Sequence, residues 1–287
     1  METAFRKMDL DSVFPVQAVR DGVIVSKRGD VTIGWEVFLP VAFSLTEEAY
    51  DDILQSLHAA VRILPPWTMV HRQDWFLYDR FVPSYDGRFL HDAYESHFAG
   101  RRYLTHRQFL YLTMTSKAGS LRPNGQTAAF GIRFSAPIPS ADDVAQFVTK
   151  AGEFATVLSG GGRLALRRLT DADLLGEDGR AGILQRYTML GSPSPLMTDI
   201  AAEGGERLRI RDQVLVGFKL SDSEGLPGEL ENVSRVDELS GPSGGLYLSK
   251  ASAVGLRLDC EHVVNQYILL PAQGQFLTDL DRKRRKM

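Results

Sequence analysis

Two side chains with catalytic potential, His71 and Asp74, lie three residues apart in the stretch 71–76, His-Arg-Gln-Asp-Trp-Phe. A histidine beside a carboxylate is half of the triad that activates a serine or cysteine nucleophile. The stretch 67–76 is predicted to be a strand, in which residues i and i+3 point to opposite faces. The favoured interpretation is therefore a structural histidine, hydrogen-bonded in or beside a sheet. A small hydrolase or transferase with a site assembled near His71 and Asp74 is the alternative.

Nucleotide chemistry has weaker support in the sequence. No stretch matches the GxxxxGK[ST] phosphate loop. The glycines at 160–162 follow a predicted helix instead of opening one, so they are interpreted as its C-terminal cap. The glycines at 241–245 and Lys250 do not have the order and spacing of a phosphate loop. The acidic pair at 237–238 does not follow the buried apolar strand that a magnesium-binding pair needs. The six histidines have none of the spacings that bring imidazoles onto one metal. We expect no catalytic residue, cofactor or metal site in this chain.

Basic side chains gather at two places that suit an interaction better than a reaction. Arg101 and Arg102 stand near Tyr103, His106 and Arg107, a mixture that suits phosphate groups or anionic lipid head groups, although a solvated face is the default interpretation. The second place follows an apolar stripe and is predicted to begin an interrupted helix over 275–287 or to touch an anionic membrane surface. Its residues are Arg282, Lys283, Arg284, Arg285 and Lys286.

The composition limits the class of protein to which this chain can belong. The chain has 287 residues, of which 44% are hydrophobic and 24% charged, with a formal net charge of -3. These values are typical of a globular protein of one or two domains, and they provide no global field that would hold a polyanion. Direct sequence-specific nucleic-acid binding is therefore not expected. The one cysteine excludes an internal disulfide and favours a reducing compartment, the cytoplasm.

The patterning predicts elements that alternate between strands and helices. Extended runs are expected at 13–19 and 22–26, and a hairpin to the strand at 31–39 is expected around the turn Lys27-Arg28-Gly29-Asp30. Apolar residues at three- and four-residue spacing predict a helix near 45–64, and further helices are expected at 89–98 and 140–158. Further strands are expected at 105–115, 127–134, 163–168, 213–220, 246–250, 253–258 and 262–270. Without regular strand-helix-strand alternation, the fold is predicted to be α+β with a mixed, mostly antiparallel sheet and helices packed on it. Trp35, Trp67 and Trp75 are expected to be largely core or subdomain-interface residues.

Several motifs, in order along the chain, resemble the N-terminal region of a known family. They include 24–32 (Ile-Val-Ser-Lys-Arg-Gly-Asp-Val-Thr), the run around His71, Gln73, Asp74 and Trp75, residues 97–106, and the run that contains Asn265, Gln266 and Tyr267. Together they are similar to the TraG conjugation ATPases of Bacteroides-type conjugative transposons. These are relatives of the CagE/TrbE/VirB-type ATPases of type IV secretion. The resemblance runs from about residue 12 to 270.

The resemblance implies a non-catalytic docking and assembly module. Residues 12–274 would form it, with a subdivision near 116–126, and 275–287 would start a helical connection to an ATPase domain that lies outside this sequence. ATP and Mg²⁺ are expected only in that domain. The implied partners are an inner-membrane subunit of the conjugation channel, the chain's own ATPase domain and, as an open alternative, further copies of the chain. The implied location is cytoplasmic, peripheral to the inner membrane.

Overall fold

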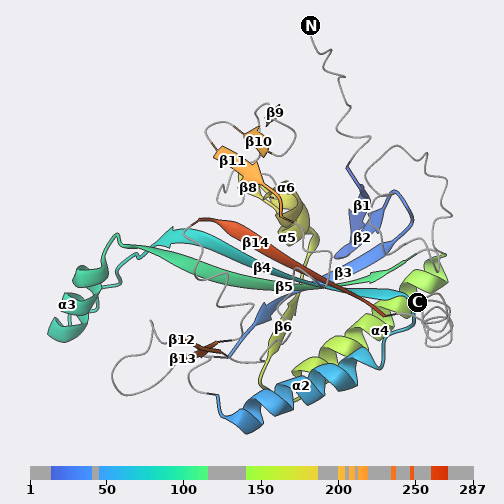
Figure 1. Cartoon of the computed structure of the whole chain (residues 1–287), viewed down its shortest axis with the longest axis horizontal. Coiled ribbons are helices and arrows are strands. Elements are labelled where there is room, and N and C mark those ends of the chain that lie inside the picture. The colour runs from blue at the N-terminus through green and yellow to red at the C-terminus, as the bar shows by residue number, and fades with distance from the viewer. Residues whose placement is uncertain are drawn as a thin grey trace, which may run out of the picture.

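A single antiparallel sheet organises the computed structural model of the protein (Figure 1). The structure describes residues 14–40, 45–115, 140–186, 200–203, 207–210, 213–218, 234–236, 246–248 and 260–270. In these ranges the sheet runs in the order β1-β2-β3-β5-β4-β14, and β6 pairs with β3. Every one of its strand pairs is antiparallel. The predicted α+β class is confirmed.

The three N-terminal strands form an antiparallel meander. β1 (Val16–Arg20), β2 (Val23–Ser26) and β3 (Val31–Phe38) are joined by tight turns, as the hairpin prediction required. β3 shares one edge between two partners, because its first residues pair with β2 and its last with β6 (Ala165–Arg168). Gly34 allows close packing here, since a Cβ atom at this position would lie 2.6 Å from the Tyr111 ring.

Two helices cover one face of the sheet. α2 (Glu47–Val61) begins at Thr46, whose side chain accepts a hydrogen bond from the Ala49 amide. α4 (Ala141–Ser159) begins with a reciprocal cap between Ser140 and Asp143, which satisfies amide groups that have no partner inside the helix. α2 and α4 pack side by side (Figure 1). Their apolar residues join alternate residues of β3, β4 and β5 in the larger core cluster.

The opposite face carries a smaller core under two short helices. α5 (Asp171–Leu175) and α6 (Ile183–Arg186) place Leu174 and Ile183 against Trp75 and Phe109 of the sheet. Because side chains alternate along a strand, residues 70 and 110 belong to the first core, while 75 and 109 belong to the second. The sheet is therefore covered on both sides near its centre.

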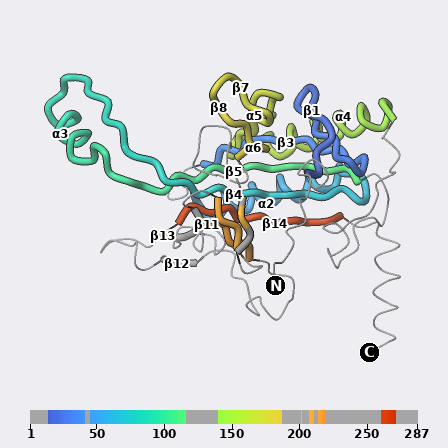
Figure 2. Tube along the Cα trace, turned by 90° about the horizontal axis from the view of Figure 1, so that it is seen from above, coloured from blue at the N-terminus to red at the C-terminus, as the bar shows by residue number. Residues whose placement is uncertain are grey.

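The two longest strands extend past their neighbours. β4 (Thr68–Arg80) and β5 (Arg102–Met114) pair along their whole lengths, whereas β14 (His262–Leu269) reaches only Phe76 and β3 reaches only Gln108. The remaining part is a two-stranded ribbon that ends in α3 (Phe89–Phe98). Both views show this ribbon and α3 projecting away from the rest of the molecule (Figures 1 and 2). We call residues 79–102 the arm.

Small strand pairs complete the described elements. β9 (Ile200–Glu203), β10 (Arg207–Ile210) and β11 (Gln213–Val216) form a three-stranded sheet. β12 (Ser234–Val236) pairs with β13 (Leu246–Leu248), and β7 (Gly176–Glu177) pairs with β8 (Arg180–Ala181). No helix in the described ranges is long and apolar enough to cross a bilayer.

Most predicted elements have counterparts at similar positions, with a few differences. The helix predicted at 89–98 has those bounds, and β4 and β5 are longer than predicted. Trp35 and Trp75 are buried, but Trp67 is only half-buried and has φ 66°, so it belongs to a turn before β4. The loop at 116–126, the strands at 127–134 and 253–258, and the segment 275–287 lie outside the described residues.

Candidate functional site

The residues of the two most specific sequence motifs meet on one face of the sheet. β14 pairs with β4 so that Asn265 lies opposite Gln73 and Tyr267 opposite His71. Asn265 Oδ1 accepts a hydrogen bond from Gln73 Nε2 at 2.8 Å and lies 2.9 Å from His71 Nε2. Gln73 Oε1 accepts from Trp75 Nε1 at 2.7 Å. These residues form a polar chain that joins β14 to the centre of the sheet.

His71 has the structural role that the strand pattern favoured. Its ring stacks on Tyr267 and Tyr111, with centroid distances of 4.2 Å and 5.3 Å. Burial lowers the pKa of His71, and the hydrogen bond with Asn265 opposes this only in part. The ring is therefore neutral at pH 7 and serves to link the two strands.

Asp74 lies on the opposite face with a different set of partners. Its Oδ1 is 2.8 Å from His106 Nε2 and accepts from Gln108 Nε2 at 2.9 Å, and its Oδ2 pairs with Arg72 Nε at 2.9 Å. Burial works to raise the pKa of Asp74, but His106 and Arg72 outweigh it and the pKa is lowered. His71 and Asp74 are therefore separated by the sheet, as their spacing predicts.

The Asp74–His106 pair was not foreseen from the sequence. In the described ranges His106 bonds to Asp74 and stacks on Phe76, without a hydroxyl or thiol group that it could activate. Gln266 lies beside Arg72 on exposed β14 and adds no reactive group.

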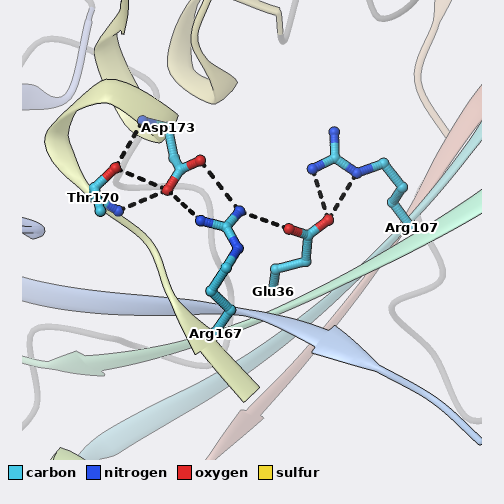
Figure 3. Close-up of polar contacts among 5 residues, drawn as sticks. All are labelled: Glu36, Arg107, Arg167, Thr170 and Asp173. Carbon is cyan, nitrogen blue, oxygen red and sulfur yellow. Dashed lines mark hydrogen bonds and ion pairs between the residues drawn. The ribbon is translucent and has the colours of Figure 1, made fainter. Parts of the chain in front are cut away.

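A second polar cluster lies on the face that bears α5 (Figure 3). Glu36 of β3 is buried and accepts from Arg107 of β5 and from Arg167 of β6, each at 2.7 Å. Arg167 also donates to Asp173 of α5 at 2.8 Å, and Asp173 in turn accepts from the Thr170 amide at 2.9 Å. This ion-pair network ties three strands to one helix.

The electrostatics of the network are those of a structural brace. For Asp173, burial works to raise the pKa, but Arg167 and Thr170 lower it to about 2. The pKa of Glu36 is likewise lowered, since its two arginines outweigh burial. Sequence reasoning missed this cluster because its members come from four separate segments. The one available signal was a glutamate inside the apolar run of β3.

The predicted basic cluster near residue 101 is divided by the structure. Arg107 is engaged by Glu36 on one face and His106 by Asp74 on the other. Arg101 lies 3.0 Å from His97 Nε2 and over the Phe98 ring, and Arg102 lies over the Tyr78 ring. Arg101 therefore braces α3, whereas Arg102 braces the ribbon, so the predicted cluster is divided among separate partners.

The inner side of α3 is polar. Glu95 is the one buried residue of this helix, and its carboxylate accepts from the Ser84 amide at 2.7 Å. Asp92 accepts from the Asp86 amide at 3.1 Å, and Asp86 Oδ1 lies 3.2 Å from His91 Nδ1. These bonds fasten the helix to the loop that precedes it.

The outer side of α3 is apolar. Phe89 and Leu90 are 84% and 80% exposed, and Tyr94 is also exposed. In the preceding loop Val82 and Tyr85 are exposed as well. We call these five residues the apolar face of the arm. Exposed apolar side chains gathered in one short segment, residues 82–94, are a candidate interaction site.

Other predicted sites are placed as follows. Asp86, His91 and Asp92 bring three potential metal ligands within 4.8 Å of one another, a set that the histidine spacings did not reveal, but their bonds already serve the arm. Gly160 ends α4, as predicted. The acidic pair at 237–238, the glycines at 241–245 and the basic tail fall outside the described residues; that tail comprises Arg282, Lys283, Arg284, Arg285 and Lys286.

Comparison with known families gives one partial match. Residues 4–58 match a family described as "Domain of unknown function, B. Theta Gene description (DUF3875)". The matched segment includes β1, β2, β3 and most of α2, but ends before β4 and the arm. A search of curated proteins finds no match. The chain is thus similar, over its N-terminal segment, to a family of Bacteroides type.

Proposed function

We propose that the chain is a non-catalytic docking and assembly module of a conjugative-transfer ATPase, and that the arm is its docking element. The observation that carries the proposal is the orientation of α3, which buries Glu95 and exposes Phe89 and Leu90. Exposing large apolar side chains to water is unfavourable by about 1.5–3 kcal/mol each, relative to burial. A partner that covers them would recover this free energy.

The conjugation setting rests on the sequence resemblance to TraG-type ATPases, and the match of residues 4–58 to a family of Bacteroides type is compatible with it. In this setting the module would hold an ATPase at a membrane-bound channel subunit, on the cytoplasmic side. ATP and Mg²⁺ would bind to the ATPase domain and not to this module. The His71 and Asp74 alternative has less support, since these residues lie on opposite faces of the sheet.

A mating experiment tests the proposal in donor cells that carry the natural gene. The double variant F89S/L90S removes the apolar anchors and should lower the transfer frequency by about tenfold or more, because each lost apolar contact weakens docking. The cellular level of the natural protein and the rate of ATP hydrolysis by its proposed ATPase domain should stay the same. Phe218→Ser is the matched control, since Phe218 is 95% exposed but lies outside the arm. Unchanged transfer in the double variant would refute the docking role.

A second measurement addresses the non-catalytic part. Calorimetry of the isolated chain with Mg-ATP should show no stoichiometric site, because no phosphate loop is present in the sequence. A site of micromolar affinity would overturn this part of the proposal.

A further inference from the structure

We propose that β14 pairs edge to edge with the β14 of a second copy of this chain, so that the two large sheets join into one across a two-fold axis at Gln266. The two strands would run antiparallel. Such a pairing brings the same residues of both copies together, as a symmetric dimer requires. The inference goes beyond the docking role of the arm and concerns a different surface.

β14 is an exposed edge strand. It ends the sheet order β1-β2-β3-β5-β4-β14, and among the described elements it packs extensively against β4 alone. Its residues 265–268 are all exposed, so the strand meets solvent on both faces of the sheet. Tyr267 is 60% exposed and Ile268 is 49% exposed. Edge strands of this kind present backbone groups with which another strand can pair.

The backbone directions of β14 are set by its contact with β4. Leu270, which directly follows the strand, turns both its amide and its carbonyl toward β4, at Thr68 and Trp67. These groups alternate between the two sides of a strand from one residue to the next. The odd-numbered residues of β14, such as Asn265 and Leu269, therefore direct their amides and carbonyls away from β4, toward the outer edge.

β14 lacks the features that keep exposed edges from pairing. Residues 262–269 contain no Lys, Arg, Asp, Glu or Pro. Their pairing with β4 runs residue by residue from His262 to Leu269 without a bulge. Edge strands that stay single usually carry a charge, a proline or a bulge. A second copy of β14 would also bring no like charges against the first.

The order of side chains in β14 favours its own copy as the partner, because the strand is chemically symmetric about Gln266. Antiparallel pairing about this residue sets amide against phenol next to the centre, and aliphatic against aliphatic further out. The pairs would be Asn265 with Tyr267, Val264 with Ile268, and Val263 with Leu269. Each pair lies on one face of the joined sheet, where such cross-strand contacts are favourable. A strand from an unrelated protein would not require this symmetry.

The size of the contact predicts a reversible dimer. Residues 263–269 span about 24 Å in an extended strand. A stable dimer interface typically buries about 800 Å² on each partner, and one pair of strands provides less. The dimer should therefore form as the concentration rises and dissociate on dilution.

Sedimentation velocity of the purified chain over a range of concentrations tests the inference. The wild type should shift from monomer to dimer. Gln266→Lys sets two like charges opposite each other at the axis and should raise the Kd by about fivefold or more. Gln266→Glu should do the same, and an equimolar mixture of the two variants should restore the dimer. Val216→Lys, which adds the same charge at an exposed residue of β11, is the control and should leave association unchanged.

Disulfide formation tests the register. Gln266→Cys is placed in a Cys260→Ser background, because Cys260 is exposed. Its Cα atom should lie about 4.5 Å from that of the copy, which is within reach of a disulfide. Oxidation should therefore give covalent dimers. Val264→Cys alone should give none, whereas Val264→Cys mixed with Ile268→Cys should, because these positions lie opposite each other.

Several outcomes would overturn the inference. A chain that stays monomeric at every concentration would do so, as would a dimer that Gln266→Lys leaves unchanged. Equal crosslinking at positions 264 and 266 would contradict the register. Benzoylphenylalanine at position 266 in donor cells should give an adduct between two copies, and an adduct with another protein alone would identify a different partner strand. None of these results affects the docking role of the arm, which the mating experiment tests.

Discussion

α4 and α3 use their side chains in opposite ways. α4 buries Phe147, Ala151, Phe154 and Leu158, which recur at three and four residues, and it exposes its polar side. α3 buries Glu95 and exposes Phe89 and Leu90. The first pattern is that of a helix packed on its own protein. The second is that of a helix whose apolar side awaits another molecule.

The difference arises from the strands that carry the two helices. α4 lies over the sheet, where alternate residues of β3 and β5 provide an apolar surface. α3 lies at the end of β4 and β5, beyond the last residues that β14 and β3 reach. Because no sheet lies under α3, its inner side meets the loop that precedes it, where Phe98 packs against the Phe81 ring. The carboxylates of Asp92 and Glu95 accept from loop amides, and Phe89 and Leu90 are left outside.

The comparison first predicts that the sheet carries the global stability. Trp75→Ala should lower the free energy of unfolding by about 3–5 kcal/mol, because the ring is fully buried. Urea denaturation measures this change. Trp75→Phe is the control: it keeps a buried ring but loses the bond to Gln73, so a smaller loss is expected. An unchanged midpoint for Trp75→Ala would show that the sheet is not the stable part.

The ion-pair network should make the second-largest contribution to the free energy of unfolding. Glu36→Gln should cost about 2 kcal/mol, because it weakens charged hydrogen bonds to Arg107 and Arg167 at a buried position. Urea denaturation at pH 7 measures the loss. Gln keeps the shape of Glu, so a wild-type midpoint would mean that the charge contributes nothing.

The same network predicts a dependence on pH. The pKa of Asp173 is about 2 in the fold, against an ordinary value of 3.8. A lowered pKa stabilises the fold above the ordinary value, and this contribution is lost as the pH falls from about 4 to about 2. Asp173→Asn should therefore lose less stability than the wild type over this range. Parallel curves for the two proteins would contradict this assignment.

The inner side of α3 should matter locally. Glu95→Ala removes the acceptor for the Ser84 amide and should weaken the arm by about 1 kcal/mol. Amide exchange in residues 84–95 should accelerate by roughly fivefold, while the urea midpoint stays almost unchanged. Ser96→Ala is the control, because it removes only the exposed 3.4 Å hydrogen bond from the Ser96 hydroxyl to the Tyr85 hydroxyl. A large shift of the global urea midpoint would instead show that the arm unfolds together with the core.

The outer side of α3 should matter least to folding. F89S/L90S should change the free energy of unfolding by no more than about 0.5 kcal/mol, because both side chains are already in water. Urea denaturation checks this expectation. A loss comparable to that of Trp75→Ala would mean that these residues are packed within the chain, which would contradict the comparison.

Sequence periodicity predicts α4 and α3 equally well, but it does not distinguish their surroundings. The residues of α3 predict a helix but not where it lies, and only the extra length of β4 and β5 reveals that it points outward. Similarly, Gln73 and Asn265 appear in separate motifs 192 residues apart, and their contact depends on strand pairing. The strand alternation of residues 71–76 was sufficient to separate His71 from Asp74, because that separation is local.

Thiol labelling tests most directly whether the apolar face of the arm is free in the isolated chain and covered in its assembly. Leu90→Cys is placed in a Cys260→Ser background, since Cys260 is exposed and would react. Maleimide should label position 90 rapidly in the purified chain and at least about tenfold more slowly in intact assemblies from donor cells. Phe218→Cys should react at similar rates in both. Equal labelling of position 90 in the two states would contradict the docking role of the arm.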